Sequence, residues 1–157
     1  MNRAPAATIL VLEDCDEDFE TVLDAARLAG VTHNFRRVTT GDECIAILRD
    51  CAQAVAPVLV LLDLNTPQGD GREALRYIKE HERLRSVPLV VLTTSANPRD
   101  LDFCYDCGAN AYHVKPVRHN EHLRVLEEIF YYWLRAVALP QEQEALTWKG
   151  NSPAPSV

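Results

Sequence analysis

The chain alternates between runs of consecutive apolar residues and stretches in which apolar residues recur every three or four positions. Consecutive apolar residues are typical of strands buried on both faces, and the three-to-four spacing is typical of helices with one buried face. The runs and two shorter segments predict five strands, at residues 8–12, 34–38, 58–62, 87–94 and 111–114. A helical pattern follows each strand, at residues 16–29, 42–50, 71–81, 98–108 and 120–139.

The order of these elements indicates the class of fold. Strands that alternate with helices form a parallel sheet whose two faces are covered by the helices, through right-handed crossovers. We therefore predict a doubly wound (βα)5 α/β domain with a five-stranded parallel sheet in the strand order 2-1-3-4-5. The folded domain is expected over residues 1–140, and residues 141–157, which contain few apolar residues, are expected to form a partly disordered C-terminal arm.

Composition narrows the classes of function. The net charge of the 157 residues is −7 and the basic residues are scattered, which argues against a nucleic-acid partner. The chain has no apolar run near the roughly 18 residues of a membrane span, and its N-terminus lacks the pattern of a signal peptide. Five irregularly spaced cysteines are a poor disulfide framework. We expect a cytoplasmic protein without membrane or nucleic-acid contacts.

Acidic and polar side chains follow the carboxyl ends of the predicted strands. Glu13-Asp14 follow the first strand, Asp63 the third, and Lys115 the fifth, while Thr93-Thr94 end the fourth. Ligands bind at this edge of an open parallel sheet, and the predicted order puts the first and third strands side by side. Three carboxylates this close repel one another, and oxygen ligands of this kind suit Mg²⁺. A single aspartate after a strand is usually a turn residue or a cap, so the joint pattern carries the prediction.

Four segments in this order resemble the receiver domain of two-component response regulators. They are VLEDCDED, LLDLNTPQGDGRE, VVLTTSA and GANAYHVKP, and the resemblance extends from about Thr8 to Ala138. It implies a flavodoxin-like receiver fold and a single-domain regulator. Nothing that follows the domain has the pattern of a DNA-binding module, so we expect the signal to pass through protein–protein contacts in a phosphorelay.

The resemblance assigns roles to the residues at the strand ends. It makes Asp63 the phospho-accepting aspartate, makes Glu13 and Asp14 the acidic pair that binds Mg²⁺ with Asp63, and gives the main-chain carbonyl of Asn65 to the same ion. The phosphoryl group would come from a phosphohistidine of a sensor histidine kinase. Such a protein catalyses its own phosphorylation and dephosphorylation and is not a turnover enzyme.

Three further roles rest on the same resemblance. The Thr93 hydroxyl and the Lys115 ammonium would contact the phosphoryl group, and Tyr112 would be the aromatic residue that switches position with Thr93. The Lys115–Pro116 bond is expected to be cis, as it is in the family.

The last predicted helix carries two apolar stripes, whereas a surface helix needs one. The second stripe predicts a homodimer interface, which would involve Ile129, Tyr132, Trp133 and Ala136; the alternative is a wide core face with tyrosines at its edge. The ending WLRAVALP resembles single-domain regulators paired with phytochrome kinases, which implies a bacteriophytochrome partner and leaves a downstream phosphotransfer protein possible. The arm, with Trp148, could pack on a partner subunit or back on its own domain.

Two other functions compete with this interpretation. Cys104 and Cys107 form a C-x-x-C pair, which could belong to a small thiol redox protein, but the pair lies toward the end of a predicted helix, and a reactive thiol favours the helix start. A binding module that works without phosphorylation is the second alternative, in which the acidic cluster would be a relic.

Overall fold

The structure is a computed structural model that describes residues 7–51, 55–67 and 70–140. Its strands are β1 (Thr8–Leu12), β2 (Asn34–Val38), β3 (Leu59–Leu62), β4 (Leu89–Thr93) and β5 (Ala111–Val114). Its helices are α1 (Asp16–Leu28), α2 (Gly41–Cys51), α3 (Gly71–Glu80), α4 (Pro98–Asp106) and α5 (His119–Tyr131), followed by the π-helical turn η1 (Tyr132–Ala136). The five predicted strand–helix pairs are confirmed; half of their ends coincide with the prediction, and all but one of the others shift by one or two residues.

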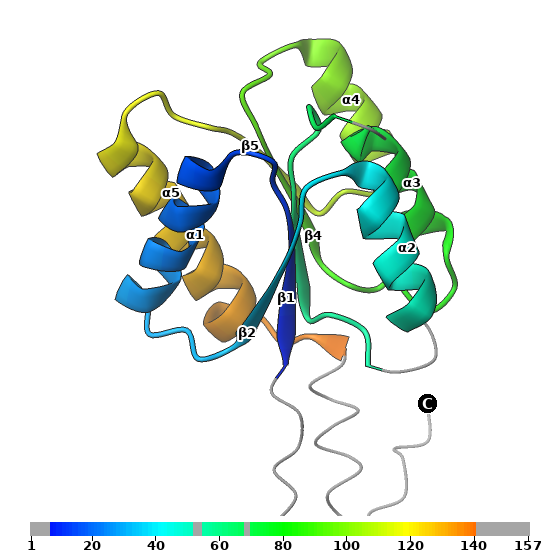
Figure 1. The fold of residues 1–157 in the computed structure, drawn as a ribbon, viewed down its shortest axis with the longest axis horizontal. Helices are drawn as coiled ribbons and strands as arrows, with labels where there is room; N and C mark the ends of the chain where they lie inside the picture. Colours follow the sequence, from blue (N-terminus) through cyan, green and yellow to red (C-terminus); the bar gives the residue numbers. More distant parts are fainter. Residues whose placement is uncertain (1–6, 52–54, 68–69, 141–157) are drawn as a thin grey trace, which may run out of the picture.

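The five strands form one parallel sheet in the order β2-β1-β3-β4-β5, which confirms the predicted topology. Figure 1 shows α1 and α5 on one face of the sheet and α2, α3 and α4 on the other. Leu12 at the end of β1 lies opposite Leu62 at the end of β3. The residues that follow these two leucines, Glu13 and Asp63, therefore leave the sheet at the same level.

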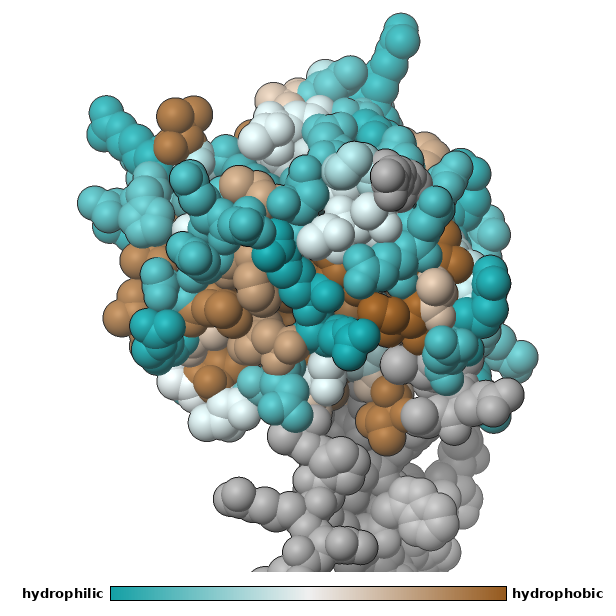
Figure 2. All heavy atoms as spheres, in the orientation of Figure 1, coloured by the Kyte–Doolittle hydropathy of each residue, from teal (hydrophilic) through white to brown (hydrophobic). Residues whose placement is uncertain are grey.

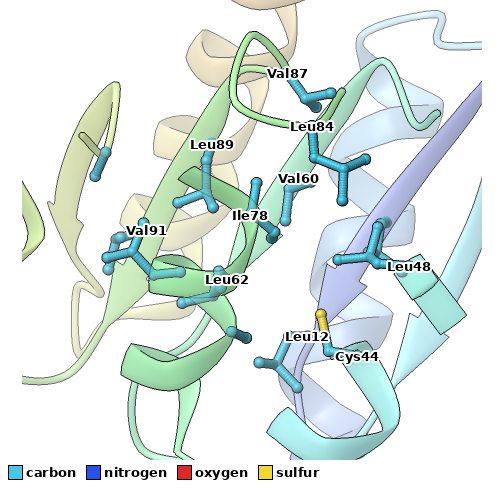
Figure 3. Close-up of a cluster of buried hydrophobic side chains, with 14 of the residues drawn as sticks. Leu12, Cys44, Leu48, Val60, Leu62, Ile78, Leu84, Val87, Leu89 and Val91 are labelled. Carbon is cyan, nitrogen blue, oxygen red and sulfur yellow. The ribbon is translucent and has the colours of Figure 1, made fainter. Parts of the chain in front are cut away.

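Each face of the sheet is covered by its own apolar cluster, because side chains alternate between the two faces of a strand. Figure 3 shows the cluster under α2 and α3, where Leu12, Leu62 and Val91 from the strands meet Leu48 and Ile78 from the helices. The other cluster fills the space under α1 and α5, and its members include Ile9, Val11, Leu59, Leu61, Leu126 and Phe130. The central strands β1, β3 and β4 are thus buried on both sides, as their continuous apolar runs predict.

The end of the last helix differs from the prediction. The α-helix stops at Tyr131 rather than near residue 139, and the chain continues as the π-helical turn. In this turn the Arg135 guanidinium donates a hydrogen bond to the main-chain oxygen of Ala29, at 2.6 Å. Ala29 is the C-cap of α1, and a cation is favourable beside the carbonyl groups of a helix C-terminus. The hydrogen bond thus ties the π-helical turn to the end of α1.

Ile129 was expected in a dimer interface, and this prediction is wrong. Its side chain is 3% exposed and packs in the cluster between the sheet, α1 and α5. The helix turns this position toward the core because α5 lies against both the sheet and α1. Tyr131 and Tyr132 remain exposed, Trp133 is half-buried, and Ala136 is exposed. The predicted arm, with Trp148, lies outside the described residues.

None of the helices in the described part of the chain combines the length and the hydropathy needed to cross a bilayer.

Gly71, the first residue of α3, approaches the main chain of Asp63 very closely. A Cβ atom built at this position would lie 2.1 Å from the Asp63 carbonyl oxygen and 2.8 Å from the Leu64 Cα atom. The Gly71 N–H also donates to the Leu64 carbonyl oxygen, at 3.2 Å. Only a glycine lets α3 start directly against the segment that follows β3.

We expect Gly71→Ala to lower the free energy of unfolding by about 3 kcal/mol, because backbone atoms must shift to admit the methyl group. Urea unfolding measures this loss. Gly108→Ala is the comparison, since a Cβ there would meet its nearest neighbour, the Lys79 side chain, at 3.5 Å. That variant should lose only about 1 kcal/mol, the cost of its positive φ. Equal losses in the two variants would contradict the close contact at Gly71.

Candidate functional site

Three carboxylates meet at the carboxyl ends of β1 and β3. One oxygen from each of Glu13, Asp14 and Asp63 lies within 4.8 Å of the others. Glu13 and Asp63 are buried, at 4% and 7% exposure, and Asp14 is exposed. The Asp63 N–H donates to the Leu12 carbonyl oxygen at 3.0 Å, so the sheet ladder itself holds Asp63 beside β1. The structure thus brings together the three side chains that the strand ends predict.

The ammonium of Lys115 lies against this cluster. Its Nζ atom donates to Glu13 Oε2 at 2.7 Å, to Asp18 Oδ2 at 2.9 Å and to Asp63 Oδ2 at 3.0 Å. The Lys115 N–H donates to the Thr93 carbonyl oxygen at 2.7 Å, which fixes the lysine main chain next to the end of β4. Two of these three acceptors, Glu13 and Asp63, belong to the predicted metal site.

Burial and charge act in opposite directions on the pKa values here. Burial would lower the pKa of Lys115, but the Glu13 and Asp63 carboxylates and hydrogen bonds to Glu13 and Asp18 together raise it. Burial raises the pKa of Glu13, and the nearby Lys115 ammonium offsets part of that rise. The lysine therefore stays charged and offsets part of the cost of burying the Glu13 carboxylate.

The chemistry of the donor set fits Mg²⁺. The trio of Glu13, Asp14 and Asp63 offers carboxylate oxygens without sulfur or imidazole, and its exposed member leaves room for water ligands. Asn65 lies beside the trio, because its N–H donates to Asp63 Oδ1 at 3.1 Å. Its predicted role as a main-chain ligand stays a prediction.

Thr93 and Tyr112 are joined through Ser95. The Thr93 hydroxyl oxygen, which is buried, accepts the Ser95 N–H at 3.2 Å and the Asn65 side-chain amide at 3.4 Å. The Tyr112 hydroxyl donates to the Ser95 carbonyl oxygen at 2.8 Å. A movement of the loop after β4 would therefore reach both side chains that the resemblance makes partners in a switch.

A polar bridge continues from this loop to α3. Ser95 Oγ donates to Asp100 Oδ2 at 2.6 Å, and the other oxygen of Asp100 accepts a hydrogen bond from the Arg72 guanidinium. Arg72 also pairs with Asp70, the N-cap residue of α3, at 3.0 Å. Hydrogen bonds from Arg72 and then Ser95 lower the pKa of Asp100. The bridge ties the start of α3 to the start of α4 beside the site.

The sequence did not predict two parts of this arrangement. Asp18 shares the first turn of α1 with Asp16 and Glu17, and the sequence offers no means to tell which of the three faces Lys115. The pairing of Arg72 with Asp100 joins residues 28 positions apart on different helices. The one available signal was that α1, α3 and α4 all begin at the carboxyl edge of the sheet.

The predicted cis bond between Lys115 and Pro116 is wrong. No peptide bond is cis in the part of the chain that the structure describes, so this bond is trans. The trans form of an Xaa–Pro bond is the intrinsically favoured one. In this trans arrangement the Lys115 ammonium reaches all three of its carboxylate partners.

The C-x-x-C pair lacks the properties of a redox site. Cys104 is buried in α4, and burial raises the pKa of its thiol to about 11. A reactive thiol needs a lowered pKa and access to solvent. Cys107 is the C-cap of the same helix, at the opposite end from the helix start that favours a reactive thiol.

The chain is similar to proteins of one known family. The sequence profile described as "Response regulator receiver domain" matches residues 9–127. Response regulator Rcp1 of Synechocystis sp. is 33% identical over 139 residues, which cover 87% of this chain and 95% of Rcp1. The crystal structure of Mn²⁺-bound Rcp1 is similar with a TM-score of 0.80, covering 85% of this chain and 99% of that one.

Two further solved structures belong to related regulators. The phosphorylated cyanobacterial phytochrome response regulator RcpA is 36% identical, with a TM-score of 0.81, and the match covers 86% of this chain and 99% of that one. The bacteriophytochrome response regulator RtBRR is 28% identical, with a TM-score of 0.64, and the match covers 92% of this chain and 90% of that one.

The Arg72–Asp100 pair should show a measurable coupling energy. In a double-mutant cycle with Arg72→Ala and Asp100→Ala, we expect about 1 kcal/mol of coupling at pH 7 from urea unfolding. Since the pKa of Asp100 is lowered in the folded protein, this contribution is complete above its unfolded pKa of about 4 and is lost as the pH falls through the folded value.

The control cycle uses Asp24 and Arg27, an ion pair on the surface of α1 whose side chains are 48% and 77% exposed. Its coupling should stay below about 0.5 kcal/mol. If the coupling energies of the two cycles are equal at pH 7, the bridge between α3 and α4 contributes no more than a surface ion pair.

Proposed function

This chain belongs to the response regulator receiver family, and from that premise we propose that it accepts a phosphoryl group on Asp63 from a histidine kinase. The observation that carries the proposal is the setting of Asp63. Its carboxylate lies between two further carboxylates, Glu13 and Asp14, and an ammonium, Lys115, whose Nζ is 3.0 Å from Asp63 Oδ2. A carboxylate with a cation site on one side and a fixed positive charge beside it suits an in-line phosphoryl transfer.

In the proposed reaction a carboxylate oxygen of Asp63 attacks the phosphorus of a phosphohistidine. The new O–P bond makes Asp63 a mixed anhydride, the P–N bond breaks, and the electron pair leaves with the imidazole, which takes up a proton from the solvent. Lys115 donates to the phosphoryl oxygens on which negative charge gathers. When bound by the carboxylates of Glu13, Asp14 and Asp63, Mg²⁺ supplies the remaining charge neutralisation. The protein is itself the product, so the reaction is not enzymatic turnover.

The proposed switch uses the link between Thr93, Ser95 and Tyr112. A phosphoryl group on Asp63 would attract the Thr93 hydroxyl, which now accepts the N–H of Ser95. A shift of Ser95 would alter the acceptor of the Tyr112 hydroxyl, at the edge of the surface formed by α4, β5 and α5. A local charge would in this way bias a two-state element.

We propose a phytochrome histidine kinase as the partner. The support is the likeness to RcpA and RtBRR, which are regulators of a phytochrome and a bacteriophytochrome, together with the ending WLRAVALP. A phosphotransfer protein could receive the phosphoryl group downstream. The proposed location is the cytoplasm, and its support is that the four described cysteines are free thiols.

The first experiment tests Asp63 directly. With Mg²⁺ and acetyl phosphate or a phosphorylated kinase, intact-mass spectrometry should detect one added phosphoryl group on the parent. Asp63→Asn should abolish it, because an amide is a poor nucleophile. Chelation of Mg²⁺ should abolish it as well.

The matched control is Asp106→Asn, the same chemical change at an exposed residue of α4. It should be phosphorylated like the parent. Phosphorylation of Asp63→Asn at the parental level would overturn the proposal. If the partner bound equally well with and without Mg²⁺ and a phosphoryl mimic, the phosphorylation-independent binding module would replace it.

We also propose that α5 and the π-helical turn form a homodimer interface. Tyr131 and Tyr132 are 61% and 51% exposed, although they are large aromatic residues. Tyr132 stacks edge-to-face on Trp133, with ring centroids 5.0 Å apart. Figure 2 shows apolar side chains at the surface in the half of the molecule formed by α1 and α5. Exposed aromatic groups of this kind are enriched in protein interfaces.

Sedimentation velocity over a range of concentrations tests the dimer. The parent should sediment as a dimer, and Tyr132→Ala should shift the population toward monomer by weakening association about tenfold or more, since aromatic anchors carry much of the binding energy. Tyr105→Ala removes a similarly exposed tyrosine of α4, at 49% exposure, and should leave the dimer intact. If the parent is monomeric at every concentration, the alternative is favoured, in which the apolar residues of the last helix form a wide core face with tyrosines at its edge.

A further inference from the structure

Asp18 adds a fourth carboxylate to the site. It lies in the first turn of α1, and its Oδ2 atom accepts a hydrogen bond from Lys115 Nζ at 2.9 Å. A lysine ammonium has three N–H donors. In this structure the three donors go to Glu13, Asp18 and Asp63, so the ammonium has no donor left for another acceptor.

The three acceptors differ in their access to solvent. The side chains of Glu13 and Asp63 are 6% and 9% exposed, whereas the Asp18 side chain is 33% exposed. Water can replace Lys115 at Asp18 at little cost, while a buried carboxylate that loses its partner pays a full desolvation penalty. The bond to Asp18 is therefore the one that Lys115 gives up most readily.

The contact between Lys115 and Asp18 borders a small cavity that also exposes a polar atom without a partner. A cavity of ≈ 10 Å³ lies beside it and is lined by Asp18, Lys115 and Asp63 among others. The buried Nε2 atom of His122, which lines the same cavity, has no hydrogen-bond partner. A cavity of this size has room for about one water molecule.

We propose that Asp18 is a positioning residue that competes with the phosphoryl group for Lys115 and so limits the stability of the phosphorylated state. This inference rests on the proposed function. Phosphorylation turns the Asp63 carboxylate into an uncharged acyl group and adds a phosphoryl dianion. Asp63 then frees one donor of Lys115, and a second donor becomes available only if Lys115 leaves Asp18 or Glu13.

The charge of Asp18 has opposite effects on the two ligands of the site. It attracts a divalent cation to the neighbouring carboxylates, and it repels the phosphoryl group. Removing this charge should therefore weaken Mg²⁺ binding and strengthen the binding of a phosphoryl mimic. A purely structural role would change both affinities in the same direction.

The test compares Asp18→Asn with Glu20→Gln, which removes the same charge from an exposed residue of α1. Calorimetric titration gives the affinity for Mg²⁺, and fluorine NMR at saturating Mg²⁺ gives the affinity for beryllofluoride. For Asp18→Asn we expect about three- to tenfold weaker Mg²⁺ binding and about three- to tenfold tighter beryllofluoride binding. Glu20→Gln should change neither affinity by more than about 1.5-fold.

Two further measurements separate the role of Asp18 from a general effect of charge. The ¹H–¹⁵N signal of the Lys115 ammonium should exchange with water faster in Asp18→Asn than in the parent, because one of its three acceptors is weakened. Asp18→Glu, which retains the carboxylate, should restore the Mg²⁺ affinity and the exchange rate at least in part.

The inference fails if both affinities fall together in Asp18→Asn, or if neither changes relative to Glu20→Gln. The proposed function fails separately, if the parent with Mg²⁺ does not bind beryllofluoride at all. If the parent binds beryllofluoride and Asp18→Asn binds it with the same affinity, the proposed phosphoacceptor role of Asp63 stands and only the proposed role of Asp18 is rejected.

Discussion

The Lys115 ammonium is the interaction on which the rest of the site depends. Glu13 and Asp63 are buried within reach of each other, and two like charges in that position would favour protonation of one of them. The lysine contacts both carboxylates, and its positive charge offsets part of this repulsion. In the proposed reaction Asp63 needs a negative charge to attack phosphorus, and Glu13 needs a negative charge to attract a cation. Lys115, which follows β5, therefore supports both the proposed nucleophile after β3 and the predicted cation ligand after β1.

The fold holds these groups in place by means that lie outside the site. The parallel register sets Leu12 opposite Leu62, and the two buried clusters leave β1 and β3 little freedom to slide. Gly71 lets α3 begin directly against Asp63, and the bridge through Arg72 and Asp100 joins that helix to α4. The apolar run before Asp63 thus serves as a rigid support for the proposed nucleophile.

The elements and the strand-end residues could be predicted from the sequence because both follow from local patterns. The consecutive apolar residues before Asp63 predict a buried strand without knowledge of its neighbours. A parallel sheet then brings the residues that follow its strands to one edge. Asp18, by contrast, differs from Asp16 only in the rotation of α1 about its axis. Ile129 was assigned to the outer surface since two apolar stripes look alike until the neighbours of α5 are known. The turn after Tyr131 contacts Ala29, more than a hundred positions earlier, and such a distant contact leaves no local pattern in the sequence.

The π-helical turn has a consequence for how this protein could change in length. A π-helical turn accommodates one more residue than an α-helical turn, and such a surplus residue is the natural product of a single insertion into an α-helix. Loss of one residue between Tyr132 and Ala136 would restore α-helical geometry and leave the core contacts of Phe130 in place. Because the widened turn absorbs the surplus residue, the chain on either side of it keeps nearly the phase of an uninterrupted α-helix. A change of one residue in length at this position would thus be absorbed within the turn and would leave the carboxyl edge of the sheet unchanged.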